Sequence, residues 1–179
     1  MSAHLHHADC GCTGLPLKGL SRRGVLGMAG AAMAAFPALA TTGHYESMVV
    51  NCIDPRVTTH TWAYMAGEGY KDLYSHFVIG GGPIGIVSPK FAAWQKAFWD
   101  NLDITIQLHN IRSVVGLTHR QCGAAAVAYG DRVKTDEAFE TANHVAALRE
   151  FKAEIGKRKP KLAVHMGIMA LDGTVEAVT

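Results

Sequence analysis

The sequence has little that would mark a nucleic-acid-binding or membrane protein. Charged residues make up only 18% of the chain, and 17 basic side chains face 15 acidic ones, so neither nucleic acid nor anionic lipid is an expected partner. No internal repeat, low-complexity stretch or second-domain linker is visible in residues 41–179. Cysteine is scarce, with four residues, and the Cys-x-x-Cys spacing typical of dithiol redox proteins is absent. A hydrophobic content of 49% in 179 residues favours one globular domain.

The N-terminal region has the three parts of an export signal. An arginine pair, Arg22-Arg23, precedes an apolar stretch at residues 24–36 and a small-x-small cleavage site at residues 38–40. The pair resembles that of a twin-arginine signal, which carries folded proteins. We predict that residues 1–40 are a signal peptide that the export machinery recognises, and that residues 41–179 form a periplasmic domain. If the segment is not cleaved, it would act as a membrane anchor.

The remaining chain alternates between strand-like and helix-like segments. Short β-branched runs predict strands at residues 47–51, 76–79 and 112–118. Helices are predicted from the Ser88-Pro89 cap onward and at residues 136–155. The C-terminal segment predicts a strand, an Asp172-Gly173 turn and a returning strand. This order is typical of an α/β fold with a mostly parallel central sheet covered by helices and an antiparallel C-terminal strand.

Both predicted helices carry an apolar stripe. The stripe of the first is aromatic and consists of Phe91, Trp94, Phe98 and Leu102. The stripe of the second consists of Val145, Leu148, Phe151 and Ile155. Packing alone requires this three- and four-residue spacing, so we expect the aromatic stripe in the core or in a dimer interface rather than in a ligand site.

Three residues with metal-binding side chains follow two of the predicted strands. Cys52 comes after the first strand, and His119 and Cys122 come after the third. In parallel sheets the carboxyl ends of the strands lie at one edge, where such side chains can converge. Two thiolates and one imidazole form a zinc triad with one open position, as in catalytic sites. The alternatives are two inert buried thiols, a disulfide, or a histidine with a purely structural role.

Two motifs together resemble the signature of the β-class carbonic anhydrases. They are Cys52-x-Asp54-x-Arg56 and, about sixty residues later, His119-x-x-Cys122-Gly123. Residues 98–126 and 162–175 are also similar to that family. The resemblance implies reversible hydration of carbon dioxide to bicarbonate, a lyase reaction with zinc-bound hydroxide as the nucleophile. It also implies a homodimer or a higher homo-oligomer.

Asp54 and Arg56 are the candidate catalytic residues beside the zinc. Asp54 can orient a zinc-bound hydroxide through a hydrogen bond, and the forked guanidinium of Arg56 can hold Asp54 away from the metal. Released from Arg56, Asp54 could become the fourth ligand and close the site. The resemblance implies that some family members do this at lower pH, so we hypothesise that activity rises with pH.

Departures from the family leave other functions open. Gly80-Gly81-Gly82-Pro83 replaces a more polar segment, and the chain leaves no room for the family's N-terminal helical arm. The same zinc site could hydrolyse carbonyl sulfide or carbon disulfide, or the domain could be a non-catalytic zinc-binding or assembly module. A dithiol redox role for Cys52 and Cys122 is the least favoured. Four histidines are candidate proton shuttles: His60, His76, His109 and His144.

Overall fold

The computed structural model describes residues 45–179, so the predicted export signal lies outside the described residues. A five-stranded sheet with the order β2-β1-β3-β4-β5 forms the centre of this domain. All pairs are parallel except β4 with β5, which is antiparallel. The strands are β1 (Ser47–Asn51), β2 (Tyr74–Val78), β3 (Ser113–His119), β4 (Ala163–Met169) and β5 (Val175–Ala177). This confirms the predicted fold class.

Helices follow all the parallel strands except β4. The α-helices are α2 (Pro55–Gly67), α3 (Pro83–Val87), α4 (Ala92–His109), α5 (Gly123–Tyr129) and α6 (Glu137–Arg158). Two 3-10 turns, η1 (Pro89–Phe91) and η2 (Asp131–Lys134), precede α4 and α6. None of the helices within residues 45–179 has both the length and the apolar character needed to cross a membrane.

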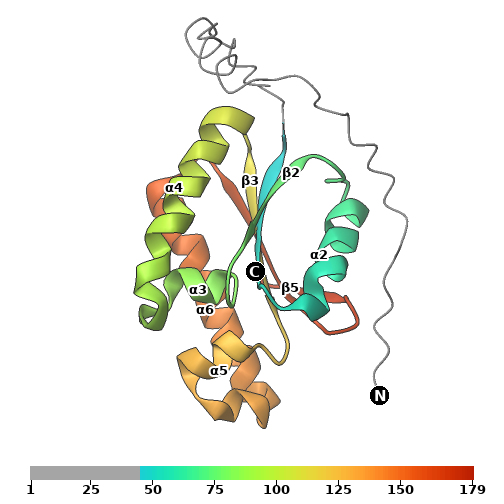
Figure 1. Ribbon diagram of the computed structural model, residues 1–179, viewed down its shortest axis with the longest axis vertical. Coiled ribbons are helices and arrows are strands. Elements are labelled where there is room, and N and C mark those ends of the chain that lie inside the picture. The colour runs from blue at the N-terminus through green and yellow to red at the C-terminus, as the bar shows by residue number, and fades with distance from the viewer. Residues whose placement is uncertain (1–44) are drawn as a thin grey trace, which may run out of the picture. The chain divides into compact units, whose positions relative to one another are not determined.

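The helices cover both faces of the sheet. Figure 1 shows α2 on one side and α3, α4 and α6 on the other, with α5 beyond the carboxyl ends of the strands. On the α2 side, Val57 and Met65 pack with Val49 of β1 and Val115 of β3. On the other side, Phe98 of α4 and Phe151 of α6 pack with Met48, Val50 and Val114. The alternation of side chains along β1 and β3 therefore divides the core into two layers.

The predicted helices occur, with one difference in how the first of them begins. Ser88 caps the 3-10 turn η1 rather than α4 itself, accepting the Lys90 N–H. Of the aromatic stripe, Phe91, Phe98 and Leu102 are buried, whereas Trp94 is 40% exposed. The Trp94 ring stacks on Phe91, with the centroids 4.5 Å apart, and lies close to Gly80. The second stripe is buried as predicted, except that Val145 is only partly buried.

The segment Gly80–Pro83 crosses the ends of β1 and β3 at very close range. Gly82 has φ = 55°, and a Cβ there would lie 2.8 Å from the Leu117 carbonyl oxygen and 3.0 Å from Asn51 backbone atoms. Only glycine has both the required conformation and the required space. The segment is therefore a packing element at the edge of the sheet where the predicted site lies.

Candidate metal centre

The first part of the site is the junction between β1 and α2, residues 52–56. Cys52 leaves the end of β1 and is 5% exposed. Asp54 is the N-cap of α2 and accepts the Arg56 backbone N–H at 2.9 Å. Pro55 occupies the first helical turn, where its missing N–H costs nothing. The cap and the proline fix the point at which the strand turns into a helix.

The second part is the junction between β3 and α5, residues 119–122. His119 is the last residue of β3, and Cys122 is the N-cap of α5. Both are buried, at 1% and 2% exposure. Gln121 between them has φ = 57°, the left-handed conformation that turns the chain sharply. This turn directs His119 and Cys122 to the same place.

The structure brings the three predicted ligands together. One ligand atom each of Cys52, His119 and Cys122 lies within 4.8 Å of the other two, and all three residues are buried. The two sulfur atoms are 3.9 Å apart, and both cysteines are free. Sulfurs bound at about 2.3 Å to a tetrahedral zinc ion lie roughly 3.8 Å apart. The spacing therefore fits a shared metal ion and is far longer than a disulfide bond.

The His119 ring is set up as a metal ligand. Its Nδ1 donates a hydrogen bond to the Arg120 carbonyl at 2.9 Å, which leaves the lone pair on Nε2. Nε2 is buried and has no hydrogen-bond partner among the described residues. An unpaired buried nitrogen is costly unless something else binds it. A metal ion held with Cys52 and Cys122 would satisfy it.

Local hydrogen bonds favour a thiolate at Cys52. The hydrogen bond between the two cysteines lowers the pKa of Cys52 and raises the pKa of Cys122, and burial also raises the latter. Gly81 donates its backbone N–H to the Cys52 sulfur at 3.2 Å, which lowers the Cys52 pKa further. The glycine segment therefore supplies a backbone donor to a candidate metal ligand. A thiolate is the form of cysteine that binds metal.

Asp54 and Arg56 form a forked ion pair at the rim of the site. The guanidinium Nε lies 3.0 and 3.2 Å from the two carboxylate oxygens, and Nη2 lies 2.7 Å from Oδ2. These bonds lower the pKa of Asp54 to about 2. Asp54 Oδ2 lies 3.9 Å from His119 Nε2, so the carboxylate is beside the metal-binding group while bound to Arg56. This is the arrangement expected of an open site.

The four candidate shuttle histidines lie in different environments. His76 bonds Asn51, the residue before Cys52, whereas His109 bonds Ser75 at the start of β2. His60 lies against Gly173 in the β4–β5 turn. His144 is fully buried on α6, and burial lowers its pKa to about 4. A shuttle must exchange protons with solvent, so His144 does not suit that role.

Two contributors to the site were not predicted from the sequence. One is the Gly81 backbone N–H, which no residue type could have revealed. The other is Glu140 of α6, whose carboxylate accepts the Gln121 N–H at 2.6 Å. A signal for Glu140 did exist, because it continues the buried stripe of His144, Leu148, Phe151 and Ile155 toward the start of α6. An acidic residue on such a stripe requires a partner.

Sequence comparison places the chain among bacterial relatives. The uncharacterized protein RC0076 of Rickettsia conorii is 31% identical over 140 residues, which cover 78% of this chain and 75% of that protein. The chain belongs to the RC0076 family. A second relative, an uncharacterized protein of Rickettsia bellii, is 28% identical over 140 residues, covering 78% of this chain and 85% of its own. No model of a known protein family matches the chain.

Structure comparison shows that this RC0076-family chain has the β-carbonic anhydrase fold. The Coccomyxa β-carbonic anhydrase in complex with acetazolamide aligns with a TM-score of 0.52 and 16% identity, covering 79% of this chain and 75% of that one. The β-carbonic anhydrase isoform I of Trichomonas vaginalis aligns with a TM-score of 0.52 and 9% identity, covering 76% of this chain and 84% of that one. A carbonic anhydrase of Glaciozyma antarctica aligns with a TM-score of 0.50 and 14% identity, covering 88% of this chain and 94% of that one. At these identities the similarity concerns the fold alone.

Proposed function

We propose that the protein is a zinc-dependent carbonic anhydrase that catalyses the reversible hydration of carbon dioxide to bicarbonate. The observation that carries the proposal is the cluster of Cys52, His119 and Cys122, with an unpartnered His119 Nε2 facing two sulfurs 3.9 Å apart. The β-carbonic anhydrase fold around this cluster supports the same reaction class. Bound zinc would supply an acidified water molecule in its open coordination position.

The chain's own residues have distinct roles in this proposal. Cys52, Cys122 and His119 hold the metal ion, and the Gly81 N–H stabilises the Cys52 thiolate. Asp54 would accept a hydrogen bond from the acidified water molecule and so fix its orientation toward carbon dioxide. Arg56 holds Asp54 ionised and in place through its forked hydrogen bonds.

The same pair provides for a closed state. If Asp54 leaves Arg56, its carboxylate is near enough to His119 to take the fourth position at the metal. Such a site would exclude water and substrate. We propose that this exchange lowers activity at acidic pH, so hydration should increase from pH 6.5 to pH 8.5. A flat profile would contradict the exchange without contradicting zinc binding.

The decisive experiment combines metal analysis with a hydration assay. The purified protein should contain about one zinc ion per chain and accelerate carbon dioxide hydration in a stopped-flow pH-indicator assay at alkaline pH. The Cys122→Ala variant is the matched control for contaminating activity. A protein that folds but binds no zinc would refute the proposal.

The alternatives within the zinc-site class predict different results. Carbonyl sulfide and carbon disulfide are linear apolar molecules that the same nucleophile could attack, so both should be assayed beside carbon dioxide. A zinc-loaded protein that turns over none of the three would indicate a non-catalytic zinc-binding or assembly module. The glycine segment at residues 80–83 is the departure that motivates this alternative.

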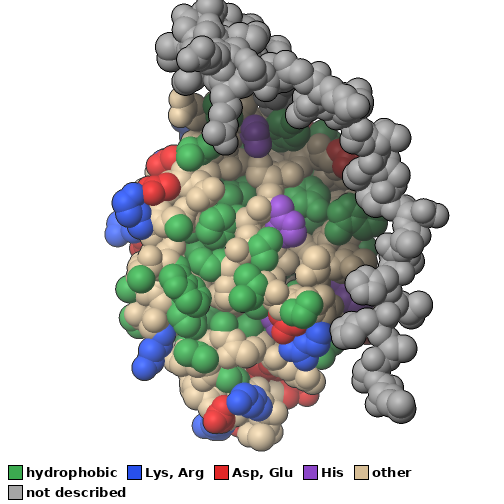
Figure 2. Space-filling model, viewed as in Figure 1, with side chains coloured by type: hydrophobic (Ala, Val, Ile, Leu, Met, Phe, Trp, Pro, Cys, Tyr) green, Lys and Arg blue, Asp and Glu red, His purple; other side chains and the backbone are tan. Residues whose placement is uncertain are grey.

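We propose that the protein assembles as a homodimer or a higher homo-oligomer. Strand β2 is an edge of the sheet, and Val78 on it is 45% exposed. On α4, Trp94 and Ile104 are 40% and 53% exposed. Figure 2 shows hydrophobic side chains gathered in the middle of one face, with charged groups mainly toward its rim. Sedimentation equilibrium at micromolar concentration tests this proposal.

We also propose export through the twin-arginine route to the periplasm, with cleavage after residue 40. A folded domain with bound zinc would protect Cys52 and Cys122 from pairing in an oxidising compartment. The mass of the protein recovered from the periplasm tests the cleavage. Replacement of Arg22 and Arg23 by lysine should keep the protein in the cytoplasm.

A further inference from the structure

We infer that Glu140 of α6 is a positioning residue of the metal centre, acting through the backbone of Gln121. The inference rests on the metal site of the proposed function, because Gln121 lies between the ligands His119 and Cys122. Residues 119–122 are called the ligand turn below.

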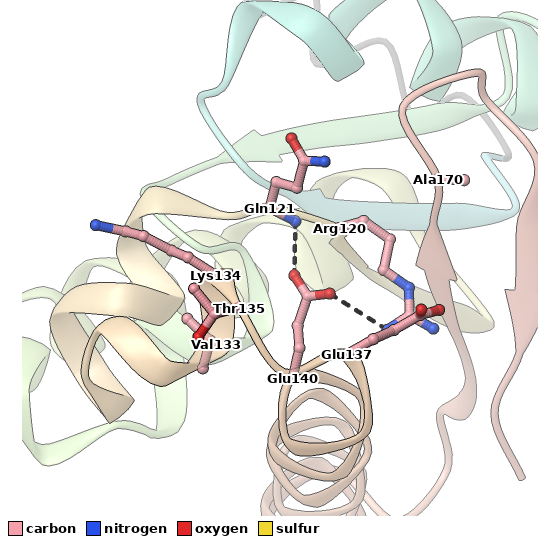
Figure 3. A pocket seen from close by; sticks show the side chains of 8 residues that line it. All are labelled: Arg120, Gln121, Val133, Lys134, Thr135, Glu137, Glu140 and Ala170. Atoms are coloured by element: carbon pink, nitrogen blue, oxygen red, sulfur yellow. Dashed lines mark hydrogen bonds and ion pairs between the residues drawn. The ribbon is translucent and has the colours of Figure 1, made fainter.

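The peptide groups of Gln121 are held from two sides. Its N–H donates to Glu140 Oε1 at 2.6 Å, and its carbonyl accepts from Arg56 Nη2 at 3.1 Å. Figure 3 shows the Glu140 carboxylate directed at the Gln121 nitrogen, beside a pocket of about 390 Å³. Gln121 is in the left-handed conformation, which is unfavourable for a residue with a Cβ. The turn therefore depends on these two external hydrogen bonds.

Burial of the Glu140 carboxylate is costly unless its oxygens have partners, and these are the Gln121 N–H, Arg120 and the ring of His144, 3.8 Å from Oε1. Glu140 is 5% exposed on the inner side of α6. Its second oxygen, Oε2, lies 3.5 Å from Arg120 Nη1, and Arg120 in turn donates to Thr141 at 2.5 Å. Glu140 does not cap its own helix, since Asp136 accepts the N–H of Phe139 there. Each oxygen of Glu140 thus contacts a residue of the ligand turn, Oε1 the N–H of Gln121 and Oε2 the guanidinium of Arg120.

The ligand turn transmits the effect of Glu140 to the metal. His119 and Cys122 are two residues before and one residue after Gln121, so a shift of this peptide changes the spacing of their ligand atoms. Arg56 binds the same peptide and also binds Asp54. Glu140 therefore supports both the ligand pair and, through Gln121 and Arg56, the carboxylate beside the metal.

Three variants test the inference by zinc affinity, measured by competition with a chromophoric chelator. Glu140→Ala should weaken zinc binding about 10- to 100-fold, as removal of groups that orient metal ligands does. Glu140→Gln keeps an acceptor oxygen for the Gln121 N–H and should restore most of the affinity. Glu137→Gln is the matched control, because Glu137 lies on the same helix and lines the same pocket but is exposed. It should bind zinc as the wild type does.

Cobalt substitution provides a readout that a merely structural role would not change. The sulfur-to-metal absorption bands of the Co²⁺-loaded Glu140→Ala protein should shift or weaken, while those of Glu140→Gln and Glu137→Gln stay as in the wild type. If Glu140→Ala does not fold, Glu140→Asp decides, because it keeps the charge but shortens the reach by one methylene.

Unchanged zinc affinity and unchanged cobalt spectra in Glu140→Ala, or in Glu140→Asp where that is used, would overturn the inference and leave the proposed function intact. Failure of Glu140→Gln to restore affinity would also overturn it, because the acceptor oxygen would then not be the deciding group. A wild-type protein that takes up no zinc would instead refute the proposed function itself.

Discussion

The two strand-to-helix junctions that carry the candidate metal ligands are held in different ways. The β1–α2 junction is stabilised mainly from within, because Asp54 caps α2 and pairs with Arg56 only two residues away. The β3–α5 junction is held from a distance. Glu140 reaches Gln121 from 19 residues further along the chain, and Arg120 pairs with Glu176, 56 residues further. The first junction is stabilised mainly by local contacts, and the second depends on contacts between distant elements.

The difference indicates which perturbations each junction should withstand. A local cap and ion pair form as soon as the short segment adopts its turn. Contacts to α6 and β5 exist only when those elements are docked. The β3–α5 junction should therefore lose its geometry first when the fold is weakened. The predictions below use the two junctions as controls for each other.

The largest effect is expected when either junction loses its thiolate. Cys52→Ala and Cys122→Ala should each lose zinc and fall to the background hydration rate, because two remaining ligands do not hold zinc in a four-coordinate site. Thr59→Ala, an exposed change on α2, is the control. Zinc content by atomic emission checks the prediction. Retention of zinc by only one of the two cysteine variants would mean that the junctions do not share one ion.

The glycine segment contacts both junctions, so its substitution should disturb them together. Gly82→Ala places a Cβ 2.8 Å from the Leu117 oxygen in a left-handed conformation. We expect the free energy of unfolding to fall by about 3 kcal/mol, measured by urea denaturation. Gly67→Ala at the end of α2 is the control, because no atom lies within 4 Å of its Cβ position. An unchanged free energy of unfolding in the Gly82→Ala protein would contradict the close packing.

Acidification should weaken the region behind the β3–α5 junction first. Burial, followed by the charge of Arg120, lowers the pKa of His144 to about 4 from 6.5, and Glu140 Oε1 lies 3.8 Å from its ring. The folded state therefore binds the proton less readily than the unfolded state. Stability is full above about pH 6.5 and is lost as the pH falls toward 4, by about 2 kcal/mol between pH 7 and pH 5.

The variant His144→Gln separates this effect from other titrations. Its free energy of unfolding should depend less on pH between 7 and 5 than that of the wild type, each measured without metal. The Asp54–Arg56 pair serves as the internal contrast, because the pKa of Asp54 is about 2 and the carboxylate stays ionised over this range. Equal pH dependence in both proteins would show that His144 is not the group responsible.

The smallest effect is expected from changes within the β1–α2 junction that keep the ligands. Arg56→Lys loses the forked contact with Asp54 and should lower kcat about 10-fold while zinc content stays the same. Asp54→Asn should also retain zinc, and any rise of activity with pH should flatten, since Asn cannot replace a carboxylate ligand. Loss of zinc in Arg56→Lys would mean that this junction also depends on a tertiary contact, that of Arg56 with Gln121.

Sequence patterns predicted the parallel sheet because β1 and β3 are short, buried and rich in valine. They did not predict α2, whose buried positions Val57, Thr61 and Met65 include β-branched residues that favour strands as much as helices. Nor could they predict that Trp94 is exposed, because periodicity identifies the apolar side of a helix but not how much of that side is covered. The strand order also depends on which strands pair in three dimensions.

The sequence could predict those parts of the site that depend on the type of side chain. Cys52, His119 and Cys122 were predicted because they lie at or after strand ends, and the structure brings them together. Asp54 and Arg56 were predicted because they follow Cys52 at alternate positions, and their roles stay predictions. The two contacts that were missed involve backbone N–H groups. The N–H of Gly81 binds the sulfur of Cys52, 29 residues away, and the N–H of Gln121 binds Glu140, 19 residues away. Backbone donors carry no residue identity, so sequence reasoning cannot assign them.

The antiparallel strand β5 has a practical consequence for handling the protein. Its Glu176 pairs with Arg120 beside the ligand turn, and Arg149 binds the carbonyl of Thr179 at 3.3 Å. An affinity handle or an immobilising tether fused behind Thr179 would pull on this strand, and through Arg120 on His119. A tag or tether should therefore be attached through an exposed side chain, such as Lys157 near the end of α6, rather than behind Thr179.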